Sequence, residues 1–347
     1  MVKSWWSNKT FLDDAYNPCG SSSGSAVAVS MGIVDIAIGT ETNGSISCPS
    51  SINGIVGMKP TTGLVSRSGI IPISSSQDTA GPMGATVDIV AKTLEVIAGY
   101  DENDPATSFI PTNFDFNFSR AINNISLKGI RLGLLDSKNS NPQVIELHNK
   151  LQEIVNSLGG ELILIDDDRD YPGDAESFVL LYEFRVGLEE YLKNANSSMK
   201  KLTDIIDFNN DNKDIVMPYF GQDIFYKSME STSYLKYLWS KYIISKSYQS
   251  TKELIEKYDL DAFIGLTRGP AWKINYDGGD YVAMNNTLEF GSGGYAAHNG
   301  MPHITIPYFE INKFPVGISI IGDRWTDKTI IGYASAIEKS RYNLDTQ

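Results

Sequence analysis

The pattern of hydrophobic and polar positions predicts that strands and helices alternate along the first third of the chain. Two segments read as short buried strands, and two others carry small or apolar residues that favour a helix. The expected strands are residues 34–38 and 54–60, and the expected helices are residues 25–31 and 86–98. Thr86 is expected to cap the second helix, and residues 39–44 are expected to form a loop. This alternation is typical of an α/β layer.

The remainder of the chain continues this pattern after a polar segment. Residues 101–127 are rich in Asn, Asp and Pro and are expected to form a long surface connection. A β-α-β unit is expected from the strand 130–135, the helix 144–158 and the strand 162–165. Further helices are expected at residues 178–192, 234–258 and 328–338, and further strands at residues 260–265, 303–307 and 316–322. We therefore predict an α/β fold, with one large mixed β-sheet sandwiched by α-helices in a single domain over residues 1–347.

Charge and cysteine content narrow the range of functions. The chain has 29 Lys and Arg against 42 Asp and Glu, a net charge of −13, which disfavours nucleic acid as a partner. No apolar run reaches the ~18–20 residues that a membrane span needs, and the first residues lack the apolar core of a signal peptide. Cys19 and Cys48 are the only cysteines and lack metal-ligand spacing, so we expect reduced thiols, no bound metal and a cytoplasmic location.

Two serine-rich clusters contain the candidate catalytic residues, and the first suggests a nucleophile elbow. The sequence GSSSG at residues 20–24 matches G-x-S-x-G with Ser22 at its centre, and His298 or His303 could act as the base. An elbow needs a buried strand before it, whereas FLDDAYNPC precedes this one, so we disfavour it. We expect His298 and His303 to be structural or surface residues, and His148 to lie on the polar face of its helix.

The second interpretation uses both clusters. A serine hydroxyl needs a base to take its proton, and it is most useful where backbone N–H groups converge on a developing oxyanion. The sequence TNGS ends in Ser45, and Gly44 can turn several N–H groups toward one point before a helix that begins near Ile46. The sequence alone leaves open the alternative that Ser45 only caps this helix.

Four consecutive blocks carry a resemblance to a known family. They read CGSSSGSAVAVS, GTETNGSISCPSS, GMKPTTGLVSRSG and QDTAGPM, within residues 17–107. In order and spacing they resemble the amidase signature family, and the first two are most similar to bacterial peptide amidases. The similarity continues more weakly over residues 128–347. The resemblance implies the amidase signature fold and a serine hydrolase that needs neither metal nor organic cofactor.

The resemblance also implies a Ser–cis-Ser–Lys triad. Ser45 resembles the nucleophile that forms the acyl-enzyme, and Ser21 resembles the bridging serine that follows a cis peptide bond after Gly20. The matching oxyanion hole consists of the backbone N–H groups of Thr42, Asn43, Gly44 and Ser45.

The chain departs from the family pattern in three ways. Asn43 stands where glycine is common, and Asn also accepts left-handed geometry. Ser47 and Cys48 stand where many relatives have an arginine, which argues against recognition of a substrate carboxylate there. The family's triad lysine lies in a K-D-N-type block well upstream of the serine pair. Lys3 and Lys9 lie in no such block, and the lysine of the MKPT block, Lys59, is a structural residue in relatives.

The resemblance therefore implies hydrolysis of a carboxamide to a carboxylic acid and ammonia. The expected substrate is an uncharged small or peptide-like amide, whose binding residues the sequence leaves unknown. Without the lysine, the N-terminally truncated chain is expected to be impaired. Two alternatives remain: a glutamyl-tRNA amidotransferase A-type subunit, and a non-catalytic truncated remnant. The sequence allows a homo-oligomer, and it predicts neither a nucleic acid nor a membrane as partner.

Overall fold

The computed structural model describes residues 10, 12–123, 126–284, 287–288 and 290–344, so Lys3 and Lys9 lie outside the described residues. Eight strands form one mixed sheet in the order β1-β3-β2-β7-β8-β6-β4-β5. Their bounds are β1 Ile36–Glu41, β2 Val56–Lys59, β3 Thr79–Gly84, β4 Arg131–Leu134, β5 Glu161–Leu164, β6 Ala262–Leu266, β7 His303–Ile311 and β8 Phe314–Ile321. β4 pairs with β5 and β6 in parallel, and the other neighbours are antiparallel.

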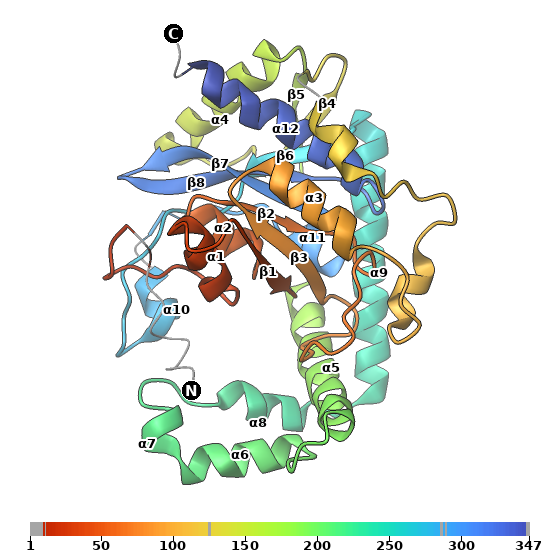
Figure 1. Ribbon diagram of the computed structural model, residues 1–347, viewed down its shortest axis with the longest axis vertical. Helices are drawn as coiled ribbons and strands as arrows, with labels where there is room; N and C mark the ends of the chain where they lie inside the picture. Colours follow the sequence, from red (N-terminus) through yellow and green to blue (C-terminus); the bar gives the residue numbers. More distant parts are fainter. Residues whose placement is uncertain (1–9, 11, 124–125, 285–286, 289, 345–347) are drawn as a thin grey trace.

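Helices lie on both faces of this sheet (Figure 1). Buried residues of α3, α4 and α12 join those of β2, β4, β6, β7 and β8 in the largest apolar cluster, while α1, α2, α9 and α11 pack elsewhere. The helices are α1 Ser23–Ser30, α2 Ser47–Ile52, α3 Val87–Ile97, α4 Pro142–Ser157, α5 Gly173–Asn194, α6 Leu202–Asp211, α7 Lys213–Val216, α8 Asp223–Glu230, α9 Tyr234–Tyr258, α10 Gly279–Met284, α11 Gly294–His298 and α12 Asp327–Leu344. The predicted α/β fold with a helix-covered mixed sheet is confirmed.

Most predicted elements are present within a few residues of their expected bounds. Thr86 caps α3, because its hydroxyl oxygen accepts the N–H of Ile89 at 3.4 Å. β4, α4 and β5 form the expected β-α-β unit with parallel strands. The loop expected at residues 39–44 is shorter than predicted, since β1 continues to Glu41 and pairs with Thr79. Gly39 permits this, because a Cβ there would lie 2.6 Å from Met83 Sδ across the pair.

Residues 101–127 do not simply cross the surface. Two 3₁₀ helices form in this segment, η2 at Pro105–Phe109 and η3 at Phe118–Asn123. Phe118 and Leu127 are completely buried in the main apolar cluster, since η3 packs against α3 and α12. The segment was expected to lie on the surface because most of its residues are polar, but a few apolar side chains hold it to the core.

Two expectations about single residues are wrong. Cys19 and Cys48 form a disulfide, with their Cα atoms 6.0 Å apart and a sequence separation of 29, instead of reduced thiols. Their pairing depends on how the fold brings α2 beside the segment before α1, which spacing does not reveal. His148 is buried and does not lie on an exposed polar face of α4. In the part of the chain that the structure describes, no helix is long and apolar enough to cross a bilayer.

Candidate active site

The loop between β1 and α2 is anchored by a buried carboxylate. Glu41 ends β1 and is 1% exposed, and its Oε2 accepts the N–H groups of Ile46 and Ser47, each at 2.8 Å. These are N–H groups that the first turn of α2 leaves without an intrahelical partner. Ile46 occupies the N-cap position without a side-chain cap. The carboxylate of Glu41, and not the hydroxyl of Ser45, therefore satisfies the start of this helix.

Two side chains of the loop are tied to distant elements. The Thr42 hydroxyl donates to Asp78 at 2.6 Å, and the Asn43 amide donates to Glu176 at 2.9 Å and to the Tyr171 hydroxyl at 3.0 Å. Burial raises the pKa of Asp78 above its ordinary value, although the hydrogen bonds that it accepts oppose the shift. These contacts fix the loop from outside, so its backbone does not depend on its own short turn for rigidity.

The backbone of this loop presents its donors together. Gly44 adopts a φ of 84°, a left-handed value that glycine accepts without a steric penalty. Among the described residues, the N–H groups of Thr42, Asn43, Gly44 and Ser45 donate to no acceptor. The loop thus has four backbone N–H groups without an acceptor among the described residues, and such donors can stabilise an oxyanion that lies beside them.

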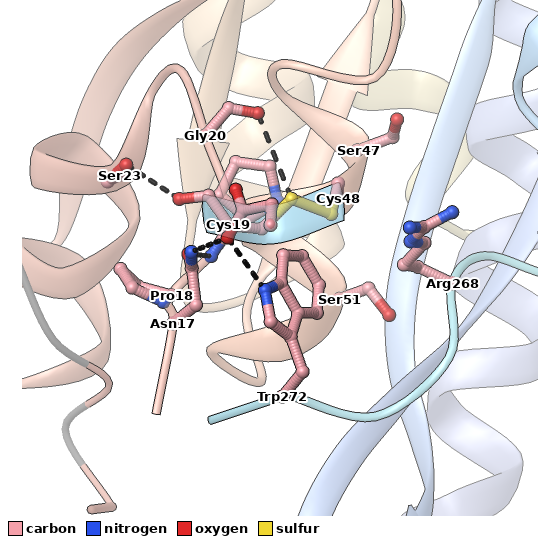
Figure 2. Close-up of a disulfide and its surroundings, with 12 residues drawn as sticks. Asn17, Pro18, Cys19, Gly20, Ser23, Ser47, Cys48, Ser51, Arg268 and Trp272 are labelled. Atoms are coloured by element: carbon pink, nitrogen blue, oxygen red, sulfur yellow. Dashed lines mark hydrogen bonds between the residues drawn. A yellow bond between two sulfur atoms is a disulfide. The ribbon is translucent and has the colours of Figure 1, made fainter. Parts of the chain in front are cut away.

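The first serine cluster lies directly beside this loop. The peptide bond between Gly20 and Ser21 is cis, as the family resemblance implies. The N–H of Ser22 donates to the carbonyl of Ser45 at 3.2 Å, and the disulfide of Cys19 with Cys48 joins the same two segments (Figure 2). Two connections, one covalent and one hydrogen bond, therefore hold the two serine clusters together.

A cavity of about 810 Å³ opens where the two segments meet. Ser21, Asn43, Gly44 and Ser45 line it, whereas Thr42 does not. Cys19, Gly20, Ser47 and Cys48 also line it. The remaining side chains come from segments far along the chain, and the sequence assigned none of them a role. They include Asp136, Asn139, Arg268, Trp272, Asp280, Met284 and Phe290.

Trp272 organises one wall of this cavity. Its indole Nε1 donates to Asp280 at 2.9 Å, and the guanidinium carbon of Arg268 lies 5.7 Å from its ring centroid. Figure 2 shows Trp272 below the disulfide and Arg268 to the right of it. An arginine thus reaches the cavity from the end of β6, although none follows Ser45 in the sequence. The spacing of the motif around Ser45 could not predict the position of Arg268.

The nucleophile elbow lacks its required geometry. The Ser22 hydroxyl accepts the N–H of Thr40 and donates to the carbonyl of Thr40, both at 3.1 Å, and Ser22 does not line the cavity. His298 and His303 are buried, and burial lowers the pKa of each to about 4. Their ring Nε2 atoms contact Ser247 at 2.8 Å and Ser319 at 2.6 Å. Of the two expected possibilities, structural or surface residues, both histidines are therefore structural.

Lys59 is buried and does not line the cavity. It is completely buried on β2, its ammonium donates to the carbonyl of Pro60 at 3.2 Å, and burial lowers its pKa to about 8. No lysine or histidine is found among the described residues that line the cavity. Nor do the described residues contain a group of three or more His, Cys, Asp or Glu side chains able to hold a metal ion.

Comparison with known proteins agrees with this architecture. A sequence model of the family described as Amidase matches residues 11–331, and the chain belongs to this family. A probable amidase of Arabidopsis thaliana is 33% identical over 340 residues, which cover 93% of this chain and 60% of that protein. The A subunit of a glutamyl-tRNA(Gln) amidotransferase of Streptococcus suis is 30% identical over 356 residues, covering 95% of this chain and 68% of the relative.

Solved structures give the same result. The native peptide amidase of Stenotrophomonas maltophilia superposes with a TM-score of 0.86 at 34% identity, covering 96% of this chain and 68% of that one. The peptide amidase PAM in complex with chymostatin superposes with a TM-score of 0.87 at 35% identity, with the same coverage. The chain spans 57–60% of the length of the amidases of plant and fungal origin that it matches.

Proposed function

We propose that this chain carries the acyl-transfer site of an amidase, in which Ser45 attacks the carbonyl carbon of a carboxamide. The hydroxyl proton of Ser45 is removed through Ser21 and returned to the leaving nitrogen, so that the C–N bond breaks with release of ammonia. Water then hydrolyses the acyl-enzyme to a carboxylic acid. The observation that carries the proposal is that Ser21 and Ser45 line one cavity with Asn43 and Gly44, and that the N–H groups of residues 43–45 donate to no acceptor among the described residues. Those donors suit the negative charge that develops on the carbonyl oxygen.

The relay requires a base beyond Ser21. A serine hydroxyl accepts a proton only while it passes its own proton on, because a neutral hydroxyl is too weak a base to hold an extra proton near neutral pH. The family resemblance assigns this role to a neutral lysine in a block upstream of the serine pair. Since no lysine or histidine is among the described residues that line the cavity, we propose that the described part of the chain lacks its base.

The proposed substrate is an uncharged or peptide-like carboxamide. A cavity of about 810 Å³ can hold a ligand larger than a simple aliphatic amide. The similarity to structures named peptide amidase supports the same class. Arg268 is accompanied in the lining by Asp136 and Asp280, so the wall carries charges of both signs instead of one anion-binding cluster.

A glutamyl-tRNA amidotransferase A-type subunit is the second candidate. It is favoured by the relative of that name, which is 30% identical over 356 residues. In that case glutamine would be the preferred amide and partner subunits would raise its turnover. Ammonia release from glutamine and from an amidated hydrophobic peptide, compared under the same conditions, distinguishes the two candidates.

Acylation by an activated ester tests the proposed nucleophile in the 347-residue chain itself. A p-nitrophenyl ester has a good leaving group, so it acylates a serine with less help from a base than an amide needs. We expect mass spectrometry to find the acyl group on Ser45, to lose it in Ser45→Ala and to retain it in the matched control Ser22→Ala. An adduct on Ser22 would instead establish the elbow, and an adduct on neither would refute the site.

A further inference from the structure

A second cavity, of about 530 Å³, lies between α9, η2 and the turn that follows β8. It shares no lining residue with the cavity that contains Ser45. The short helix α11 separates the two, since Gly294 at its start lines the first cavity and His298 at its end lines the second. Nothing in the proposed acyl transfer uses this second cavity.

Arg324 is held at the second cavity in a fixed orientation. Its Nε donates to the carbonyl of Asn299 at 2.7 Å, and its guanidinium carbon lies 3.9 Å from the ring centroid of Tyr248. The Tyr248 hydroxyl is fixed in turn by a 2.7 Å hydrogen bond to Asp323. The two terminal nitrogens of Arg324 donate to no acceptor among the described residues. A guanidinium that is stacked on a ring and held through Nε, with its two terminal nitrogens free to donate, is preorganised to bind a planar anion.

Lys241 brings a second positive charge to the same cavity from α9. Its ammonium donates to the Ser76 hydroxyl and lies 3.8 Å from Glu183. Burial lowers the pKa of Lys241, Glu183 opposes this change, and the charge of Arg324 adds to it. An anion placed between Lys241 and Arg324 would relieve that repulsion.

The acidic residues near this pair do not line the cavity. Glu183 lies 3.8 Å from Lys241, and Asp323 accepts the hydroxyl of Tyr248 and lies 3.8 Å from Lys252. Neither Glu183 nor Asp323 lines the cavity, and no lining residue carries a carboxylate. In a chain with a net charge of −13, the lining of this cavity therefore carries two cationic side chains and no carboxylate. A negatively charged ligand is favoured here over a neutral or a cationic one.

Two aromatic residues determine the rest of the ligand. Phe109 is 75% exposed at the edge of the cavity, and Trp325 lines it next to Arg324. We propose that the second cavity binds a small organic carboxylate, whose charged group lies between Arg324 and Lys241 and whose apolar body contacts Phe109 and Trp325. This site is distinct from the acyl-transfer site and does not depend on the function proposed for it.

Calorimetric titration of the 347-residue protein with phenylacetate tests the proposal. We expect saturable binding at millimolar concentration, and no binding of 2-phenylethanol, which has the same ring without the charge. Arg324→Gln and Lys241→Met should each weaken binding about tenfold or more, since each removes a charge-assisted contact. The matched control is Lys252→Gln, because Lys252 is also on α9 and near Asp323 but does not line the cavity.

Thermal melting of each variant establishes that it is folded before titration. If Arg324→Gln does not fold without its bond to Asn299, Lys241→Met carries the test alone, since the Lys241 side chain is partly exposed. Unchanged affinity in the folded variants would overturn the proposal, and so would the absence of saturable binding. Loss of affinity in Arg268→Gln but not in Arg324→Gln would place the anion in the first cavity and overturn it as well.

Discussion

Cys19 and Cys48 are covalently joined with their Cα atoms 6.0 Å apart, at the place where the two serine clusters meet. One cysteine directly precedes the cis Gly20–Ser21 bond, and the other lies in α2, shortly after Ser45. The disulfide therefore closes a covalent loop that contains both candidate catalytic serines. Its position lets folding stability and site geometry be probed together.

Removal of this disulfide should lower stability. It closes a segment with a sequence separation of 29, and the loss of such a crosslink typically costs about 2–4 kcal/mol because the unfolded chain gains freedom. We expect the double variant Cys19→Ser and Cys48→Ser to lose this amount in urea unfolding, and wild type with a reducing agent to behave alike. Two free thiols in unreduced wild type would contradict the assignment.

Glu41→Gln should destabilise the start of α2. The carboxylate accepts the N–H groups of Ile46 and Ser47, and an amide of the same shape keeps an acceptor oxygen but loses the charge. The expected cost is about 1–3 kcal/mol, measured by urea unfolding. Glu102→Gln, at an exposed position, is the matched control. Equal stability of both variants would show that the anchor contributes nothing.

Two buried histidines should make the protein sensitive to acid. The pKa values of His298 and His303 are lowered to about 4 in the folded state by burial, from an ordinary value of 6.5. Between these values the unfolded chain binds protons that the folded protein does not, so the free energy of unfolding falls as the pH decreases from 6.5 toward 4. Above pH 6.5 this contribution is constant.

The size of the effect can be measured on one histidine. Each contributes a slope of up to about 1.4 kcal/mol per pH unit in that window. Urea unfolding at several pH values should show a smaller slope for His303→Gln than for wild type, with the carboxylates common to both. If the two slopes are the same, His303 binds its proton equally in both states and the burial argument is wrong.

Amide turnover by this chain should be low. With no lysine or histidine among the described residues of the cavity lining, the general-base contribution of about 10²–10⁴-fold is expected to be missing. An upstream extension that carries a K-D-N-type block should restore it, as measured by ammonia release. Full activity without the extension would identify another base. Lys59→Met is then the first variant to test, because burial lowers the pKa of Lys59 to about 8.

Substrate preference can be measured on the extended protein. An amidated hydrophobic peptide should be hydrolysed faster than a malonamate-type acid amide, because an unpaired carboxylate in the cavity would be costly. Arg268→Gln should leave this preference unchanged. A preference for the acid amide that disappears in Arg268→Gln would show that Arg268 recognises a substrate carboxylate, and would reverse the proposed class.

The sequence was most informative where local pattern and local structure agree. The bounds of α9 match the predicted helix at both ends, and its buried residues follow one another at helical spacing of three or four positions. The nearness of Ser21 to Ser45 followed from the order of four motifs and not from any periodicity. The same motifs could not reveal Arg268 or Trp272, because these side chains reach the cavity through the pairing of strands distant in sequence.

Partners across the fold were equally hidden. Nothing near Cys19 or Cys48 indicates that α2 brings them within bonding distance. His148 is a polar residue, yet it is among the buried residues of α4. Burial of a polar residue depends on which face a neighbouring element covers, and this information is absent from the residue's own segment.

The anchors of the loop over residues 42–45 are spread across the molecule, since Thr42 is held by Asp78 and Asn43 by Tyr171 and Glu176. A graft of the short loop alone onto another scaffold would leave these anchors behind. The smallest portable unit must also include β3's preceding turn and the first turn of α5. The signature block can thus be recognised in the sequence, but it is not an independent structural module. Moving it alone into another protein would transfer its sequence without its conformation.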